Sequence, residues 1–163
     1  MTNSPIIVLE AALAHNRVIG AGGQVPWDLP VDRAHWRGLV KGHALIVGEA
    51  TYEQQGSLED SINIVVTGNA ELAVKDGLAA TSIDRAISLA REHESTEIFV
   101  VGGASIFEQT IALADKLYLT LIDLDVPNGD RFFPEYEDDF TVTSQKSGHD
   151  NGLDYRFVIL KRR

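Results

Sequence analysis

The most chemically suggestive stretch of the sequence is 11–32, AALAHNRVIGAGGQVPWDLPVD, in which a carboxylate follows a glycine-rich loop. A helix is expected to begin at Pro30, which places Asp32 in its first turn, where the helix dipole stabilises an acidic side chain whatever its further role. Trp27 precedes this carboxylate and Trp36 follows it by one helical turn, on the same face, although both tryptophans fit a hydrophobic core equally well. We predict that Asp32 is a proton donor that the fold holds beside a planar ligand.

Two strand-to-helix turns carry glycines that would let backbone N–H groups approach a phosphate. Gly102 and Gly103 follow the apolar run FVV, and Gly48 follows ALIV. A side chain at such a turn would block the approach, and the start of a helix attracts anions. Glycine pairs also occur in tight connections that bind nothing. Two such turns at the carboxyl ends of parallel strands favour a nucleotide lying across the sheet edge.

Five apolar runs rich in Val, Ile and Leu predict the buried strands that position these residues. They span residues 6–13, 44–47, 62–67, 98–101 and 117–122. Helical patterns between them span residues 30–40, 50–55, 82–93 and 104–114. The alternation predicts an α/β fold, with a mostly parallel central sheet covered by helices on both faces.

The C-terminal part of the chain has a different pattern. The segments FTVTSQ (140–145) and DYRFVIL (154–160) alternate apolar and polar residues on either side of the turn-like SGHDNG. This predicts a C-terminal antiparallel edge hairpin. Because no linker, repeat or low-complexity stretch divides the chain, residues 1–163 are expected to form a single domain.

Composition excludes several function classes. The net charge of -10, from 24 acidic and 14 basic residues, would repel a phosphate backbone, so we expect no nucleic-acid partner. No apolar run approaches the roughly 20 residues of a membrane helix. The start MTNSPIIVLE does not look like a secretory signal, so we expect a cytoplasmic protein. With no cysteine and no closely spaced histidine pair, we expect no metal.

Five motifs occur here in one order and spacing: AALAHNRVIG, VPWDLPVD, the turn Val101-Gly102-Gly103-Ala104, LYLTLID and GDRFFPEY. With them the chain resembles the dihydrofolate reductase family from about Ile6 to its last residues. The resemblance implies a monomeric α/β enzyme of one-carbon metabolism with a small-molecule substrate. In such enzymes a hydride passes from NADPH to C6 of 7,8-dihydrofolate while N5 gains a proton, which gives 5,6,7,8-tetrahydrofolate.

The same resemblance assigns expected roles to residues. Family members use one buried carboxylate, here Asp32, to support the protonation and to bind the pterin's amino group and N3. Thr120 matches the threonine that hydrogen-bonds this carboxylate, and Trp27 matches the tryptophan that holds a water beside it. An apolar pocket favours the neutral form of a carboxyl group, which suits assistance to proton delivery. The expected catalytic residues are therefore Asp32, Trp27 and Thr120.

The remaining site residues follow from the same motifs. Residues 19–24 match the loop that closes over the nicotinamide, and Thr51 is expected between the two ligands. The expected substrate-binding residues are Glu10, Ala11, Ala12, Asp32, Arg33, Trp36, Thr51, Gln55, Leu58, Val101 and Thr120. The expected cofactor-binding residues are Ala12, Ile19, Gly20, Gly48, Glu49, Ala50, Thr51, Thr67, Gly68, Val101, Gly102, Gly103, Ala104, Ser105, Ile106 and Phe107.

The cofactor side departs from the family pattern at two positions. Glu49 stands where an arginine usually contacts the adenosine 2'-phosphate, and Gly68 stands where a serine or arginine is common. A carboxylate repels a phosphate dianion but accepts a hydrogen bond from a free ribose 2'-hydroxyl. We expect NADPH as cofactor with a weakened preference over NADH.

The substrate side departs as well. Ser61 replaces the arginine that grips the glutamate tail of folate, which removes a charge-assisted contact. Glu10 and Gln55 replace apolar residues near the ring, and Arg33 stands where a leucine is usual, from which it would reach the tail's carboxylates or face solvent. Phe107 lacks the hydroxyl of the usual tyrosine.

We therefore expect the reaction chemistry of the family to be kept and the recognition of cofactor and substrate to be altered. Three functions fit the sequence. The leading one is reduction of dihydrofolate. The substrate-side departures would also suit a reductase of the same fold that acts on another pterin, a pyrimidine-like compound or an imine. The cofactor-side departures would suit a non-catalytic nucleotide-binding relative.

Overall fold

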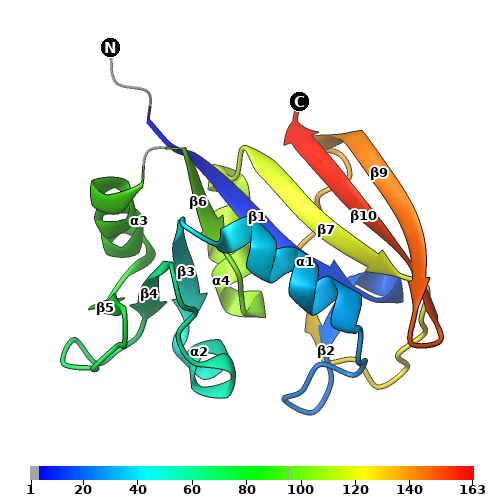
Figure 1. Cartoon of the computed structure of the whole chain (residues 1–163), viewed down its shortest axis with the longest axis horizontal. Coiled ribbons are helices and arrows are strands. Elements are labelled where there is room, and N and C mark those ends of the chain that lie inside the picture. Colours follow the sequence, from blue (N-terminus) through cyan, green and yellow to red (C-terminus); the bar gives the residue numbers. More distant parts are fainter. Residues whose placement is uncertain (1–3, 95) are drawn as a thin grey trace.

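The computed structural model describes residues 4–94 and 96–163, and these residues form two β-sheets (Figure 1). The large sheet has eight strands in the order β5-β4-β3-β6-β1-β7-β10-β9, and the small one pairs β2 with β8. The strands of the large sheet are β1 (Ile6–Leu13), β3 (Ala44–Gly48), β4 (Ile62–Val66), β5 (Gly77–Ala80), β6 (Glu97–Val100), β7 (Lys116–Ile122), β9 (Phe140–Asp150) and β10 (Leu153–Arg162). Those of the small sheet are β2 (Val18–Gly20) and β8 (Arg131–Phe132).

The pairing confirms the predicted mostly parallel sheet. β1 lies parallel to both β6 and β7, and β3, β4, β5 and β6 continue the parallel arrangement. β10 runs antiparallel to β7 and to β9, which makes the C-terminal hairpin the edge of the sheet, as expected. The five predicted strands are β1, β3, β4, β6 and β7, each within one residue of the expected ends, because continuous runs of Val, Ile and Leu are typical of strands buried on both faces.

The predicted hairpin turn is wrong in its length. Most of SGHDNG belongs to β9, and the turn consists of Asn151 and Gly152 alone, with φ of 49° and 77°. Two residues with positive φ match the twist of the flanking strands, which explains the Asn-Gly pair. Gly148, which suggested a turn, lies within the strand opposite Tyr155, and a Cβ at this glycine would collide with the tyrosine ring.

Three short strands were not predicted. β5 has the sequence GLAA, which lacks β-branched residues, and its Gly77 lies so close to the backbone of Asn63 that a Cβ would overlap it. β2 and β8 contain only three and two residues, and they pair with each other. Such short segments give no periodicity to detect.

The helices agree closely with the predicted patterns. They are α1 (Pro30–Val40), α2 (Glu49–Gln55), α3 (Ile83–His93) and α4 (Ala104–Thr110), with short 3-10 turns η1 (His15–Arg17) and η2 (Ile111–Leu113). The predicted helix 104–114 is too long, because α4 ends at Thr110 and continues as η2. None of the helices within residues 4–94 and 96–163 is long and apolar enough to cross a membrane.

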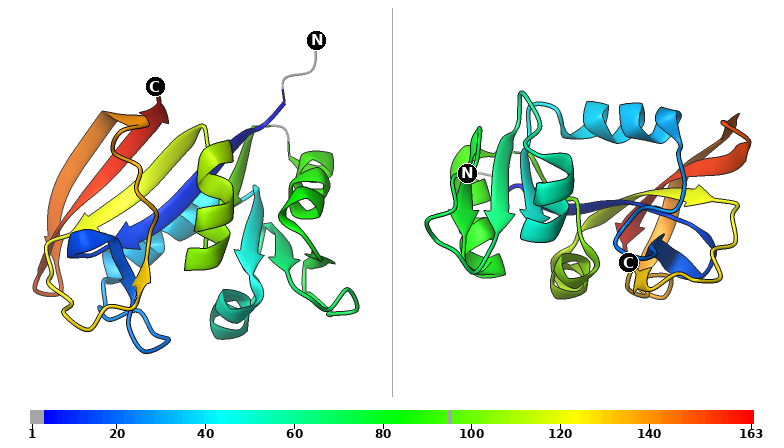
Figure 2. Two further views of the ribbon diagram at one scale, coloured as in Figure 1. Left: turned by 180° about the vertical axis from the view of Figure 1, so that it is seen from behind. Right: turned by 90° about the horizontal axis from the view of Figure 1, so that it is seen from below.

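The helices cover both faces of the sheet, which confirms the expected layers. In the right-hand view of Figure 2, α1 lies on one side of the sheet and α4 on the other. Ile7 and Leu9 of β1 belong to the cluster that contains Ile106 of α4, whereas Val8 packs in a second cluster with Val40 of α1. Because successive side chains of a strand alternate between faces, the even-numbered residues of β1 lie on the α1 side.

Candidate active site

A hollow with a volume of about 880 Å³ opens on the α1 side of the sheet. It is lined by residues of β1, α1 and α2, by the loop after β2, and by the turn that joins β6 to α4. The carboxyl ends of three adjacent parallel strands, β3, β6 and β1, meet here. This is the sheet edge at which ligands of α/β proteins bind.

Asp32 lies in the first turn of α1 and points to the sheet. Its Oδ1 accepts a hydrogen bond from the hydroxyl of Thr120 on β7 at 2.5 Å. The two side chains are buried, with 7% and 1% of their surface exposed. Thr120 pairs with Ala12 of β1, so the carboxyl group is fixed against the central strands of the sheet.

The surroundings of Asp32 favour its neutral form. Burial raises the pKa of Asp32 above its usual value, and the hydrogen bond from Thr120 together with the charges of His35 and Arg33 offsets part of this rise. His35 stacks on Phe157 with the ring centroids 3.8 Å apart, and burial lowers the pKa of its imidazole. The carboxyl group of Asp32 is thus poised to hold or release a proton closer to neutral pH than an exposed aspartate.

Two further polar side chains of the hollow lack partners in the part of the chain that the structure describes. Glu10 is 6% exposed and lines the hollow, and burial followed by the negative charge of Asp32 raises its pKa well above the usual range. The side-chain nitrogen of Gln55 is buried without a hydrogen-bond partner among the described residues. Buried polar groups are normally hydrogen-bonded, so both point to a ligand or water at this wall.

The glycine turn forms a close-packed part of the wall. The backbone N–H of Gly48 donates to the carbonyl of Gly102 at 2.8 Å, which ties the end of β3 to the turn before α4. A Cβ at Gly103 would lie 3.2 Å from the hydroxyl of Thr51, and Gly102 has a φ of 126°. Glycine is therefore required here by space and by conformation, and the bare backbone allows a phosphate group to approach.

At the α2 end of the hollow the only charged lining residue is acidic. The carboxylate of Glu49 accepts a hydrogen bond from the hydroxyl of Thr67, which in turn accepts one from the backbone N–H of Asn69 at 3.0 Å. The basic residues among the described lining come from α1 and β8: Arg33, Arg37 and Arg131. None of them belongs to α2 or β4, and none forms an ion pair with Glu49.

The hollow brings together most of the residues that the sequence predicted. The predicted residues that line it are Glu10, Ala11, Ala12, Ile19, Gly20, Trp27, Asp32, Arg33, Trp36, Gly48, Glu49, Ala50, Thr51, Gln55, Val101, Gly102, Gly103, Ala104, Ser105, Ile106 and Phe107. Thr120 lies behind this wall and contacts it through Asp32. The predicted residues Leu58, Thr67 and Gly68 do not line the hollow, and Thr67 reaches it only through Glu49.

Several lining residues were not among the predicted binding residues. They are Val25, Leu29, Arg37, Gln54, Val66 and Arg131. Arg37 follows Arg33 by one helical turn, so its face of α1 was detectable from spacing. Arg131 lies in the motif GDRFFPEY, but only the pairing of β8 with β2 brings it to the loop. The side chain of Gln54 donates a hydrogen bond to the carbonyl of Gly23 at 2.8 Å, which holds the loop 20–25 against α2.

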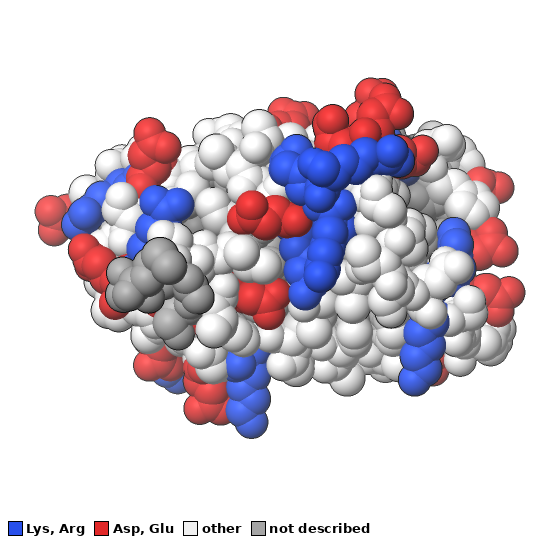
Figure 3. All heavy atoms as spheres, turned by 90° about the horizontal axis from the view of Figure 1, so that it is seen from above, with Lys and Arg blue, Asp and Glu red and all other residues white. Residues whose placement is uncertain are grey.

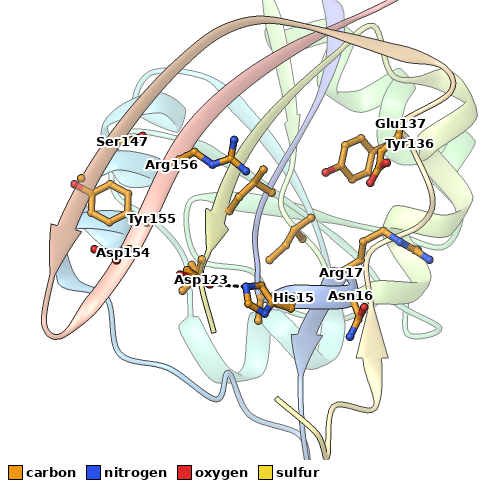
Figure 4. A pocket seen from close by; sticks show the side chains of 15 residues that line it. His15, Asn16, Arg17, Asp123, Tyr136, Glu137, Ser147, Asp154, Tyr155 and Arg156 are labelled. Atoms are coloured by element: carbon orange, nitrogen blue, oxygen red, sulfur yellow. Dashed lines mark ion pairs between the residues drawn. The ribbon is translucent and has the colours of Figure 1, made fainter. Parts of the chain in front are cut away.

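A second hollow, of about 700 Å³, lies beside the hairpin and contains residues of η1, β7 and β10 (Figure 4). Several of its charged groups already have partners in the protein. His15 lies between Asp123 at 2.7 Å and Asp125 at 2.6 Å, and the hydrogen bond to Asp125 is the main cause that raises its pKa. Arg17 donates to the carbonyl of Phe133 at 2.6 Å. Because these groups are already paired, the hollow beside Asp32 is the better candidate for an active site.

Comparisons with known proteins identify relatives over nearly the whole chain. A family model described as dihydrofolate reductase matches residues 6–162. The chain is 36% identical over 162 residues to a dihydrofolate reductase of Haemophilus influenzae, covering 95% of this chain and 98% of that one. It is 32% identical over 157 residues to one of Bacillus subtilis, covering 93% and 92%. The structure of Enterococcus faecalis dihydrofolate reductase complexed with NADP(H) and RAB-propyl superposes with a TM-score of 0.87 at 25% identity, covering 100% and 99%.

Proposed function

This chain belongs to the dihydrofolate reductase family, and from that premise we propose how its own residues reduce 7,8-dihydrofolate to 5,6,7,8-tetrahydrofolate with NADPH. The observation that carries the proposal is the buried pair of Asp32 and Thr120 at the wall of the hollow. NADPH supplies the hydride when it is bound. The chain must then orient the pterin ring, exclude water and support the arrival of a proton at N5.

Asp32 orients the ring. The hydroxyl of Thr120 takes up one acceptor site of its Oδ1, so the remaining acceptor sites of the two oxygens are proposed to accept hydrogen bonds from the pterin's amino group and from N3–H. The raised pKa of the carboxyl group lowers the cost of placing a proton near it at neutral pH, which supports protonation of N5. Trp27 lines the same hollow and is proposed to hold the water that delivers this proton.

The loop 19–24 is proposed to exclude bulk water from the reacting atoms. Ala21 and Gln24 exchange two backbone hydrogen bonds, at 2.9 and 3.2 Å, which close a tight turn. Gly22 and Gly23 at its tip have positive φ, and the carbonyl of Gly23 accepts the hydrogen bond from Gln54 of α2. A loop held at its tip across the opening suits a lid.

The glycine turn fits a dinucleotide. The bare backbone at Gly102 and Gly103, which a Cβ would fill, is proposed to face the pyrophosphate, with Ala104–Phe107 beside it. Ala12, Ile19 and Gly20 line the hollow and are proposed to contact the nicotinamide. Thr51, within reach of the glycine turn, would lie between cofactor and substrate.

The adenosine end suits a ribose hydroxyl better than a phosphate. Glu49 is held in place by Thr67, and no cation of the described lining neutralises it. A fixed carboxylate accepts a hydrogen bond from a 2'-hydroxyl and repels a 2'-phosphate. We therefore propose that NADPH is used with a weak preference over NADH. The ratio of kcat/KM for the two cofactors tests this, and an NADPH preference of about a hundredfold or more would contradict it.

Arg37 is the better candidate for binding the acidic tail of the substrate. Arg33, which the sequence suggested, forms an ion pair with Asp28. Ser61 is buried, and its hydroxyl donates to the carbonyl of Val40 at 3.0 Å, so it does not face the hollow. Arg37 is exposed at the rim of the hollow and has no carboxylate partner among the described residues. Its guanidinium is free to bind a carboxylate.

We propose that residues 1–163 act as one domain, as a cytoplasmic monomer with no nucleic-acid partner. On the face shown in Figure 3, a band of basic side chains is bordered by acidic ones. The net charge of -10 opposes binding to a polyanion.

The direct test of the proposed function is the oxidation of NADPH by purified protein in the presence of dihydrofolate. We expect turnover within about tenfold of the usual enzyme range of 1–1000 per second. A rate that saturates with another pterin or an imine but not with dihydrofolate would favour the related reductase. Absence of nicotinamide binding in calorimetry would favour the non-catalytic relative.

A further inference from the structure

Glu10 places a second carboxyl group in the pocket of Asp32. On β1, Glu10 and Ala12 lie on the α1 side of the sheet, and they pair with Tyr118 and Thr120 of β7. Thr120 is the residue that binds Asp32. Glu10 lies two residues before Ala12, the strand partner of Thr120, so about 7 Å separates the backbone of Glu10 from that of Ala12. Both carboxyl side chains line the same hollow.

The Glu10 carboxyl group is without a partner among the described residues. Within residues 4–94 and 96–163 it makes no hydrogen bond and no ion pair, although only 6% of the residue is exposed. Burial and then the charge of Asp32 raise the pKa of Glu10 well above its usual value, which favours a protonated carboxyl group that can donate a hydrogen bond. A largely buried carboxyl group that lines a ligand pocket, and that no described protein group satisfies, is placed to hydrogen-bond a ligand there.

We propose that the Glu10 carboxyl group hydrogen-bonds directly to the heterocycle that Asp32 binds, and so determines which heterocycles the pocket accepts. The inference rests on the reductase function proposed above and adds a second group that recognises its substrate.

The two carboxyl groups have complementary chemistry. Ionised Asp32 only accepts hydrogen bonds, and it matches the amino and N–H edge of a pterin-class ring. Protonated Glu10 also donates one, so it matches a carbonyl oxygen or an unprotonated ring nitrogen elsewhere on the same ring. A bound ring without such an acceptor would leave the Glu10 donor without a partner, which is how a site rejects a close analogue.

A pair of variants separates a direct hydrogen bond from an effect of charge. Glu10→Gln and Glu10→Leu both remove the ionisable group, but only glutamine keeps a donor and an acceptor. Dihydrofolate binding without cofactor is measured by the fluorescence of Trp27 and Trp36, which are the two tryptophans of the chain and both line the hollow. KM for dihydrofolate and the thermal midpoint of the unliganded protein are measured beside it.

We expect Glu10→Gln to keep KM and Kd for dihydrofolate within about threefold of the wild type, and Glu10→Leu to raise both about tenfold. The thermal midpoint of unliganded Glu10→Leu should rise by about 2–4 °C, because an unpaired polar group is replaced by an apolar one. Should leucine prevent folding, Glu10→Met replaces it. Glu53→Gln and Glu53→Leu, at an exposed position of α2 outside the hollow, are the matched controls and should change neither constant.

Equal impairment of Glu10→Gln and Glu10→Leu would overturn the inference, because it would mean that Glu10 acts only through the charge felt by Asp32. An unimpaired Glu10→Leu variant would overturn it as well. A wild-type protein that neither binds nor reduces dihydrofolate would instead refute the proposed function itself.

Discussion

Replacing Thr120 by valine removes one hydroxyl and tests how Asp32 is held. Valine has nearly the same shape as threonine, so the packing of β7 against β1 is kept. The lost contact is the 2.5 Å hydrogen bond to the carboxyl oxygen of Asp32, between two side chains that are 1% and 7% exposed. Water cannot readily replace the hydroxyl at such a buried place.

The magnitude follows from the strength of a hydrogen bond to a charged group, about 1.5–3 kcal/mol. The bond stabilises the ionised carboxyl group, so its loss raises the pKa of Asp32 further. If ionised Asp32 binds the pterin, kcat/KM for dihydrofolate should fall about tenfold to a hundredfold near neutral pH. The loss should be greatest at the acidic end of the pH range, where more of the variant's Asp32 is protonated.

The assay is kcat/KM for dihydrofolate as a function of pH, together with the thermal midpoint. Thr120→Val should lose about 4–10 °C in midpoint, and Thr120→Ser, which keeps the hydroxyl, should recover most of the activity. A valine variant that folds and keeps both wild-type kcat/KM and the wild-type pH dependence would refute the reasoning, since it would show that the hydrogen bond does not set the state of Asp32.

Three further predictions concern other parts of the site. Glu49→Arg should lower the KM for NADPH at least about tenfold and leave that for NADH nearly unchanged, because it places a cation at the ribose; an equal change for both cofactors in steady-state assays would be contrary to this. Arg37→Gln should raise the KM for dihydrofolate about fivefold to tenfold with little change in kcat, whereas Arg33→Gln, whose partner is Asp28, should have a smaller effect. Glu10→Gln should stabilise the protein against urea unfolding at about pH 8 but not at about pH 4. The pKa of Glu10 is raised in the folded state, so the stability of the wild type falls as the pH rises above the usual pKa of an unfolded glutamate. A gain in stability that is the same at both pH values would exclude this linkage.

Much of the fold was predictable because its central strands carry a strong local signal. β1, β3, β4, β6 and β7 are apolar runs buried on both faces, and such runs stand out in any sequence. β5 was missed because alanine and glycine carry no strand preference, and it is defined by its partner β4. Gly148 suggested a turn, but it lies in a strand to make room for the ring of Tyr155, a contact between strands that local sequence does not reveal.

The candidate site was predictable in its outline but not in its pairing. Asp32 and Thr120 are 88 residues apart, and the order of the motifs indicated that they would meet. The sequence could not show that Arg33 forms an ion pair with Asp28. Arg37 is therefore the arginine of α1 that lines the hollow without a carboxylate partner among the described residues. The sequence also could not show that Glu10 lacks a partner within residues 4–94 and 96–163, because this depends on every side chain around it.

The central claim is that Asp32 supports reduction of dihydrofolate, and the most direct test is the rate of NADPH oxidation with dihydrofolate by the wild type and by Asp32→Asn. Asparagine keeps the size of the side chain but cannot become a carboxylate, so we expect turnover by the wild type and a loss of about a hundredfold to ten-thousandfold in the variant. A folded Asp32→Asn variant that keeps the wild-type rate would contradict the account.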